Sequence, residues 1–158
     1  MTQRFFFVTF LAGLCLFVLP FETTAQPFAK SGGMVAFRAA ASTADFPPMA
    51  APGKKVSIGK DYYFVYNFDK KPKLGTVIVR VEVFTADGKR DTSFEVKGDC
   101  GMPSMKGAHD MGEQPFKLSK SGTYLLPIQI VMPGDWEIRL TFLKNGQVVF
   151  RGSHSFDV

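Results

Sequence analysis

The sequence contains few of the residues on which catalytic and nucleotide-binding sites usually depend. Its 158 residues include two cysteines, two histidines and one tryptophan. It has no glycine pattern of the phosphate-cradling or dinucleotide-binding kind, no internal repeat and no segment with helical periodicity. The 19 Lys and Arg residues outnumber the 14 Asp and Glu residues, but the charges alternate in sign and form no basic block. This pattern argues against nucleic acid as a partner.

The one long apolar run lies near the N-terminus, from Phe5 to Phe21, after the short basic start MTQR. A run of about 17 residues is at the short limit for a membrane span. Thr23 and Ala25 are small residues at the positions that a signal peptidase reads. We therefore expect residues 1–25 to be a signal peptide and the protein to be periplasmic or secreted. Retention of the run as a membrane anchor is the alternative.

Cysteine usage sets a second limit. Cys15 lies inside the apolar run and follows Leu rather than a small residue, so we do not expect a lipid anchor. Loss of the signal leaves Cys100 as the one cysteine of a chain of about 130 residues, and no intramolecular disulfide can form. In an oxidising compartment, an unpaired thiol indicates intermolecular pairing, a metal ligand or a buried inert side chain.

The rest of the chain divides into a lead-in and a strand-rich domain. Residues 26–54 are rich in Ala, Pro, Gly and Ser without alternation, which predicts a flexible lead-in. In residues 55–158, apolar and polar residues alternate with period 2. The turn sequences ADGKR, PGD and KNG separate the alternating segments. The pattern predicts an all-β fold, a two-sheet immunoglobulin-like sandwich of roughly seven or eight strands.

The alternation also predicts which side chains form the core. Three expected strands carry apolar residues on one face: Tyr62, Phe64, Tyr66 and Phe68; Val77, Val79, Val81 and Val83; and Trp136, Ile138, Leu140 and Phe142. Met132 and His154 share the buried parity of their own strands. We therefore expect both to pack in the sandwich rather than to bind a ligand.

The loop DCGMPSMKGAHDMGEQP, from Asp99 to Pro115, concentrates the chemistry of the chain. Its Pro and Gly residues and its lack of periodicity predict an irregular surface loop. The candidate metal ligands in it are Cys100, Met102, Met105, His109 and Met111. Thioether sulfur is soft and uncharged, so this set favours Cu(I) over Zn(II), Ca(II) or Mg(II). Alternatively, the methionines cap the sandwich as adaptable apolar side chains.

An enzymatic function is not expected. A Cys–His pair between Cys100 and His109 is conceivable, because the two lie nine residues apart. Both belong to one Gly-rich loop, with no nucleophile elbow or second His-bearing segment nearby. The residues favour a copper-binding module, a Cu(I) carrier or sensor. The alternative is a metal-free envelope interaction domain that uses the same loop as a docking surface.

The motif CGMPSMKGAHDM followed by GTYLLPIQIVMPGDWEIRLTF resembles the YtkA-like and FixH-like family of small exported immunoglobulin-like domains. The resemblance covers residues 56–158, and the matching positions are Met102, Pro103, Met105, His109, Met111, Gly134 and Trp136. The chain differs from the family pattern in two ways. It has one His in the loop where many relatives have more, and a cleavable signal replaces the FixH-type transmembrane anchor.

The resemblance implies an extracytoplasmic β-sandwich whose Met/His loop takes part in copper handling. It further implies a copper ion as ligand, and an envelope metal transporter or an oxidase assembly protein as partner. Neither nucleic-acid binding nor stable membrane insertion after signal cleavage is expected.

The processing of the N-terminus is the first prediction. Because TTAQP follows the apolar run, the exported protein should begin at Gln26 or Pro27. Intact-mass spectrometry of the protein from the periplasmic fraction or the medium measures this directly. A full-length chain in the membrane fraction would instead identify residues 5–21 as an anchor.

Overall fold

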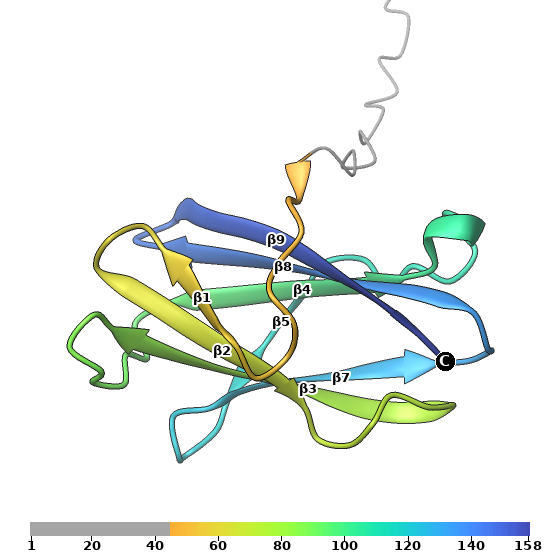
Figure 1. Cartoon of the computed structure of the whole chain (residues 1–158), viewed down its shortest axis with the longest axis horizontal. Helices are drawn as coiled ribbons and strands as arrows, with labels where there is room; N and C mark the ends of the chain where they lie inside the picture. Colours follow the sequence, from red (N-terminus) through yellow and green to blue (C-terminus); the bar gives the residue numbers. More distant parts are fainter. Residues whose placement is uncertain (1–44) are drawn as a thin grey trace, which may run out of the picture. The chain divides into compact units, whose positions relative to one another are not determined.

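Two antiparallel sheets pack face to face in the computed structural model, which describes residues 45–158 (Figure 1). The strands are β1 (Lys55–Ile58), β2 (Tyr62–Phe68), β3 (Gly75–Thr85), β4 (Glu95–Gly101), β5 (Gln114–Pro115), β6 (Lys117–Leu118), β7 (Tyr124–Ile130), β8 (Asp135–Lys144) and β9 (Gln147–Asp157). A 3-10 turn, η2 (Pro103–Met105), lies between β4 and β5.

One sheet has the strand order β1-β2-β3-β7-β6 and the other β5-β4-β8-β9. The predicted all-β sandwich is confirmed. The two shortest strands, β5 and β6, have two residues each, a length at which period-2 alternation gives no signal. The predicted signal peptide, residues 1–25, and residues 26–44 of the predicted lead-in lie outside the described residues.

The core lies between the sheets and consists of alternate residues of the long strands. The fully buried side chains include Phe64, Tyr66, Val77, Val79, Val81, Val83, Trp136, Ile138, Leu140 and Phe142, as the alternation predicts. Tyr62 and Phe68, at the two ends of β2, are half-buried. Phe64 and Phe142 join the sheets through rings whose centroids lie 4.4 Å apart. Aromatic packing of this kind accounts for much of the stability of a sandwich of this size.

The end of the predicted lead-in is attached to the edge strand β9. The amide of Met49 donates to the Ser153 carbonyl (2.7 Å), and the Ser153 amide donates to the Pro47 carbonyl (2.9 Å). At Gly152, a Cβ atom would lie 2.4 Å from Cγ of Met49, so only glycine allows this approach. Residues 46–49 thus pair with backbone groups that an edge strand otherwise leaves free, a contact that composition does not reveal.

Several loops emerge together at one end of the sandwich, on the right of Figure 1. The paired strands end here at three residue pairs: Gly75 with Ile130, Gly101 with Glu137, and Asp135 with Asp157. We call this the loop end and define it by residues 69–74, 102–113 and 131–134. It includes residues 102–113 of the loop Asp99–Pro115, which carries the candidate metal ligands.

Truncation of the buried indole tests the core. Replacing Trp136 with Ala should lower the free energy of unfolding by about 3 to 5 kcal/mol. The side chain is fully buried, and its N–H donates to the Met132 carbonyl (3.1 Å). Chemical denaturation measures the change. Leu118→Ala is the control, because Leu118 is 50% exposed, and it should cost less than about 0.5 kcal/mol. Equal losses in the two variants would contradict this core.

Candidate metal-binding site

The loop that carries the predicted ligands starts where β4 ends and is closed at its base. The amide of Met111 donates to the Cys100 carbonyl (3.0 Å), so the first and last predicted ligands are neighbours through the backbone. Gly101 allows this closure, because a Cβ atom there would lie 1.9 Å from Oδ1 of Asp110. A side chain at position 101 would therefore push the returning segment away from the sheet.

The turn η2 fixes the outer part of the loop. Pro103 occupies its start, where a fixed φ and a missing N–H are compatible with a helical turn. The Met105 amide donates to the Met102 carbonyl (3.0 Å). Ser104 donates to the Asp135 carboxylate through its amide (3.2 Å) and through its hydroxyl. These bonds join η2 to the first residue of β8 and give Met105 a defined place on the surface.

Cys100 lies on the inner face of β4 and is fully buried. The pKa of its thiol is raised to about 12, mainly by burial; the carboxylates of Asp99, Asp110 and Glu137 contribute to the rise, and Arg139 opposes it. The thiol is therefore protonated at neutral pH, whereas the thiolate is the metal-binding form. Of the three roles open to this cysteine, the geometry favours the buried, inert one over the predicted thiolate ligand.

Met102 also belongs to the core, since its side chain is 4% exposed. Its Cε atom lies 2.8 Å from the point that a Cβ of Gly134 would occupy, so the thioether is pressed against the turn between β7 and β8. This is the capping role that the sequence left open for the methionines. Met102 would reach an ion only by leaving its contact with Gly134.

The other three predicted ligands keep contact with solvent. Met105 is 40% exposed, and His109 and Met111 are half-buried. Met111 also packs against the edge of the core. Within residues 45–158, no three side chains of His, Cys, Asp or Glu are placed to hold a metal ion. A metal site in this loop would therefore depend on thioether sulfur and one imidazole.

A charged cluster that the sequence did not predict lies on the outer face of β4 and β8. Its members are Asp99, Asp110, Glu137 and Arg139, with guanidinium–carboxylate distances of 3.4, 3.8 and 3.5 Å from Arg139 to Asp99, Asp110 and Glu137. Burial raises the pKa of Asp99, Arg139 opposes the shift and Asp110 adds to it. The alternation places Glu137 and Arg139 off the core face, but the pairing of Arg139 with Asp99 requires the strand register.

Met132 and His154 pack as expected. Met132 is half-buried against the core, beside the indole of Trp136 that donates to its carbonyl. The ring of His154 lies 5.8 Å from Tyr66 and 6.4 Å from Phe156, centroid to centroid. Burial lowers the pKa of His154. Both residues therefore remain outside the candidate site.

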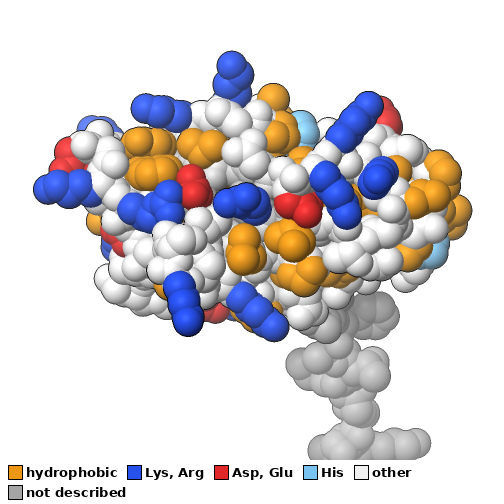
Figure 2. Space-filling view, turned by 90° about the horizontal axis from the view of Figure 1, so that it is seen from below, with side chains coloured by type: hydrophobic (Ala, Val, Ile, Leu, Met, Phe, Trp, Pro, Cys, Tyr) orange, Lys and Arg blue, Asp and Glu red, His pale blue; other side chains and the backbone are white. Residues whose placement is uncertain are grey.

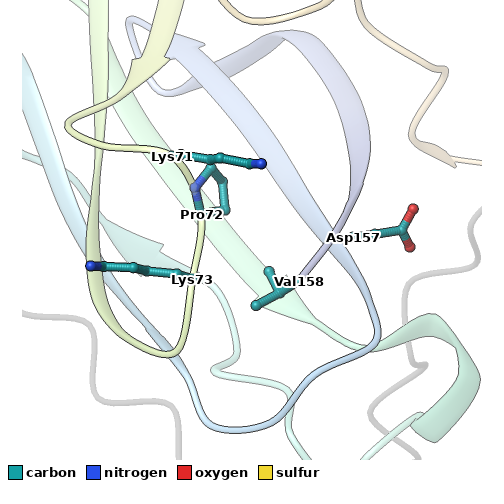
Figure 3. A pocket seen from close by; sticks show the side chains of 5 residues that line it. All are labelled: Lys71, Pro72, Lys73, Asp157 and Val158. Carbon is teal, nitrogen blue, oxygen red and sulfur yellow. The ribbon is translucent and has the colours of Figure 1, made fainter.

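A shallow hollow of about 330 Å³ lies elsewhere at the loop end. It is lined by Lys71, Pro72, Lys73, Asp157 and Val158 (Figure 3). The ammonium group of Lys73 points away from the other four residues, whereas the Lys71 side chain points toward the side on which Asp157 and Val158 lie. Two lysines and one carboxylate around Pro and Val supply no nucleophile with an adjacent base, so we assign no chemistry to it.

One face of the sandwich, seen from below, is chemically mixed. Figure 2 shows Lys and Arg side chains interspersed with acidic and apolar ones on this face. Such a surface produces no extended field of one sign. In the part of the chain that the structure describes, no helix is both long and apolar enough to cross a bilayer.

A family model described as YtkA-like matches residues 57–141. Among curated proteins, none matches the chain. Similar solved structures include FetP of uropathogenic Escherichia coli strain F11, with 12% identity and a TM-score of 0.45; the match covers 68% of this chain and 93% of FetP. They also include a DUF4426 family protein of Pseudomonas aeruginosa PAO1, with 12% identity and a TM-score of 0.47; this match covers 66% of this chain and 96% of the other. A copper-bound variant of FetP also has 12% identity and a TM-score of 0.45, and covers 71% of this chain and 95% of its own. At these values the neighbours carry no argument about ligands.

The state of Cys100 can be tested by alkylation. In the folded protein, a thiol reagent at neutral pH should modify Cys100 at least about 100-fold more slowly than in denaturant, because the thiol is buried and protonated. Mass spectrometry follows the adduct with time. Reaction at a similar rate in both states would mean that the thiol is within reach of solvent, and would return Cys100 to the ligand set.

Proposed function

The chain belongs to the YtkA-like family, and we propose that it is an exported copper-binding domain that holds Cu(I) in its Met/His loop. The observation that carries the proposal is the division of the soft donors. Met105, His109 and Met111 stay in contact with solvent outside the strands, while Cys100 and Met102 fill the core. Apolar side chains elsewhere in the sandwich are mainly aromatic and branched aliphatic.

The accessible donors suit Cu(I) by their chemistry. Two thioethers and one imidazole make a set of uncharged donors without a thiolate when they bind a metal, which favours Cu(I) and contributes little affinity for Zn(II). Met105 and Met111 lie in a loop whose base is closed and whose outer turn is attached to β8. Cu(I) needs few ligands, so three donors are sufficient. Met102 would be a fourth only after rearrangement.

We place the domain among carriers or sensors rather than enzymes. Against the Cys–His pair that the sequence allowed, the thiol of Cys100 is buried while His109 stays at the surface. A site that reaches solvent through one loop suits uptake and release of an ion. Location in the periplasm or outside the cell, and transfer of copper to an envelope transporter or oxidase assembly protein, are part of this proposal.

The second candidate function is a metal-free docking surface. Leu74 and Val131 are 54% and 53% exposed; Leu74 directly precedes Gly75 and Val131 directly follows Ile130, which pair with each other at the loop end. Together with Met105 they place apolar side chains at the surface beside the turns. Methionine adapts its shape to different partners, so the same loop would contact a protein without binding an ion.

Removal of the accessible thioethers separates the two functions. The double substitution of Met105 and Met111 by Leu keeps the volume and apolarity of the side chains but removes both sulfur donors. Cu(I) affinity of the reduced protein, measured by competition with a chromogenic chelator, should fall at least tenfold, about 1.4 kcal/mol. The melting temperature should barely change. Met49→Leu is the matched control, because Met49 packs against Gly152 on β9, and it should keep full affinity.

Two results would contradict this ligand set. Unchanged copper affinity in the double variant, with loss of binding to an envelope partner, would favour the docking surface. A large loss of affinity in Cys100→Ser, without a change in stability, would show that the buried thiol takes part after all. Zn(II) serves as the metal control and should bind the parent protein only weakly.

A further inference from the structure

The charged cluster beside the loop contains one cation, the guanidinium of Arg139. We propose that Arg139 is a positioning residue for the proposed copper site in the loop Asp99–Pro115: it holds the backbone between His109 and Met111 against β4 and β8. The inference rests on the proposed function, because these two residues are proposed ligands. It concerns a residue that is not itself a proposed ligand and that acts through carboxylates.

The contacts of Arg139 connect the sheet to the loop. Its side chain is 16% exposed, and Nη2 lies 3.4 Å from Oδ2 of Asp99 on β4 and 3.8 Å from Oδ1 of Asp110 in the loop. Asp110 stands directly between the proposed ligands His109 and Met111. One guanidinium nitrogen therefore lies between the strand and the loop segment whose position decides where the two ligands lie.

Asp110 transmits this contact to the rest of the loop. Its Oδ2 atom accepts the amide of Gly107 (3.1 Å), and its Oδ1 atom faces the space left by the missing side chain of Gly101. The next residue, Met111, donates to the Cys100 carbonyl (3.0 Å). If Arg139 no longer attracts the Asp110 carboxylate, the turn at Gly107 and the closure at Met111 should both loosen.

The charge of the cluster gives a way to separate positioning from electrostatics. Three carboxylates surround one guanidinium, with Oε2 of Glu137 3.5 Å from Nε of Arg139. Removal of the positive charge makes the surroundings of the loop more negative, which by itself attracts a cation more strongly. Loss of loop order weakens binding. The two effects have opposite signs, so the direction of the change in Cu(I) affinity identifies which of them operates.

The test compares Arg139→Gln with Arg90→Gln. Arg90 is the matched control, because it forms an ion pair with Glu82 (2.9 Å) away from the loop end. In Arg139→Gln, Cu(I) affinity should fall about tenfold, and the amides of Gly107 and Met111 should exchange with deuterium at least about tenfold faster. Exchange in β3 should stay as in the parent. Arg90→Gln should leave both loop amides and copper affinity unchanged.

Each other result has a definite meaning. Tighter copper binding in Arg139→Gln would overturn the proposal, since it would show that Arg139 acts through charge alone. Unchanged exchange at Gly107 and Met111 would overturn it too. If the parent protein binds no Cu(I), the proposed function fails, while the exchange rates still decide whether Arg139 orders the loop.

A second variant covers the case in which Arg139→Gln does not fold. Asp110→Asn removes the attraction between loop and guanidinium but leaves Arg139 paired with Asp99 on the strand. Asp110 is an exposed residue, so the fold should tolerate the change. The Met111 amide should again exchange faster than in the parent. Exchange at the parent's rate would overturn the proposal.

Discussion

The antiparallel register between β4 and β8 determines most of what this protein presents at its loop end. It pairs Cys100 with Ile138 on the core side and Asp99 with Arg139 on the outer side. Because side chains alternate along a strand, a slip of one residue would exchange these faces, exposing the thiol and burying the charges. The hydrophobic core enforces the register, since both strands contribute fully buried residues to it. The packing of the core and the shape of the loop are therefore linked.

The loop shows how one cluster of soft atoms in the sequence is divided by burial. Cys100 and Met102 lie below the surface and contribute apolar area, whereas Met105 reaches solvent. For a buried thiol, desolvation outweighs the favourable effect of a nearby guanidinium, and the group stays protonated. A soft metal would then meet neutral donors. Such a set matches Cu(I), whose charge needs little compensation, better than a divalent ion.

The charged cluster has a cost as well as a role. Oδ1 of Asp99 and Nε of Arg139 are buried without a hydrogen-bond partner among the described residues, and such atoms lose hydration without full compensation. Apolar residues at these positions would avoid this desolvation penalty. They would not reach out to a loop carboxylate, however. Positioning of the loop gives a physical reason for charged groups at a site where stability alone does not favour them.

The sequence by itself determined the all-β class, the inner faces of β3 and β8 and the family, because these depend on alternation and local motifs. The alternation along β4 was enough to predict that the thiol is buried, because Val96 and Cys100 lie four residues apart and share the inner face. Tertiary structure alone decided the pairing of Asp99 with Arg139, the return of Asp110 onto Gly101, and the attachment of residues 46–49 to β9. These contacts join segments far apart in the chain, and their partners follow from strand register and close packing rather than from any local pattern.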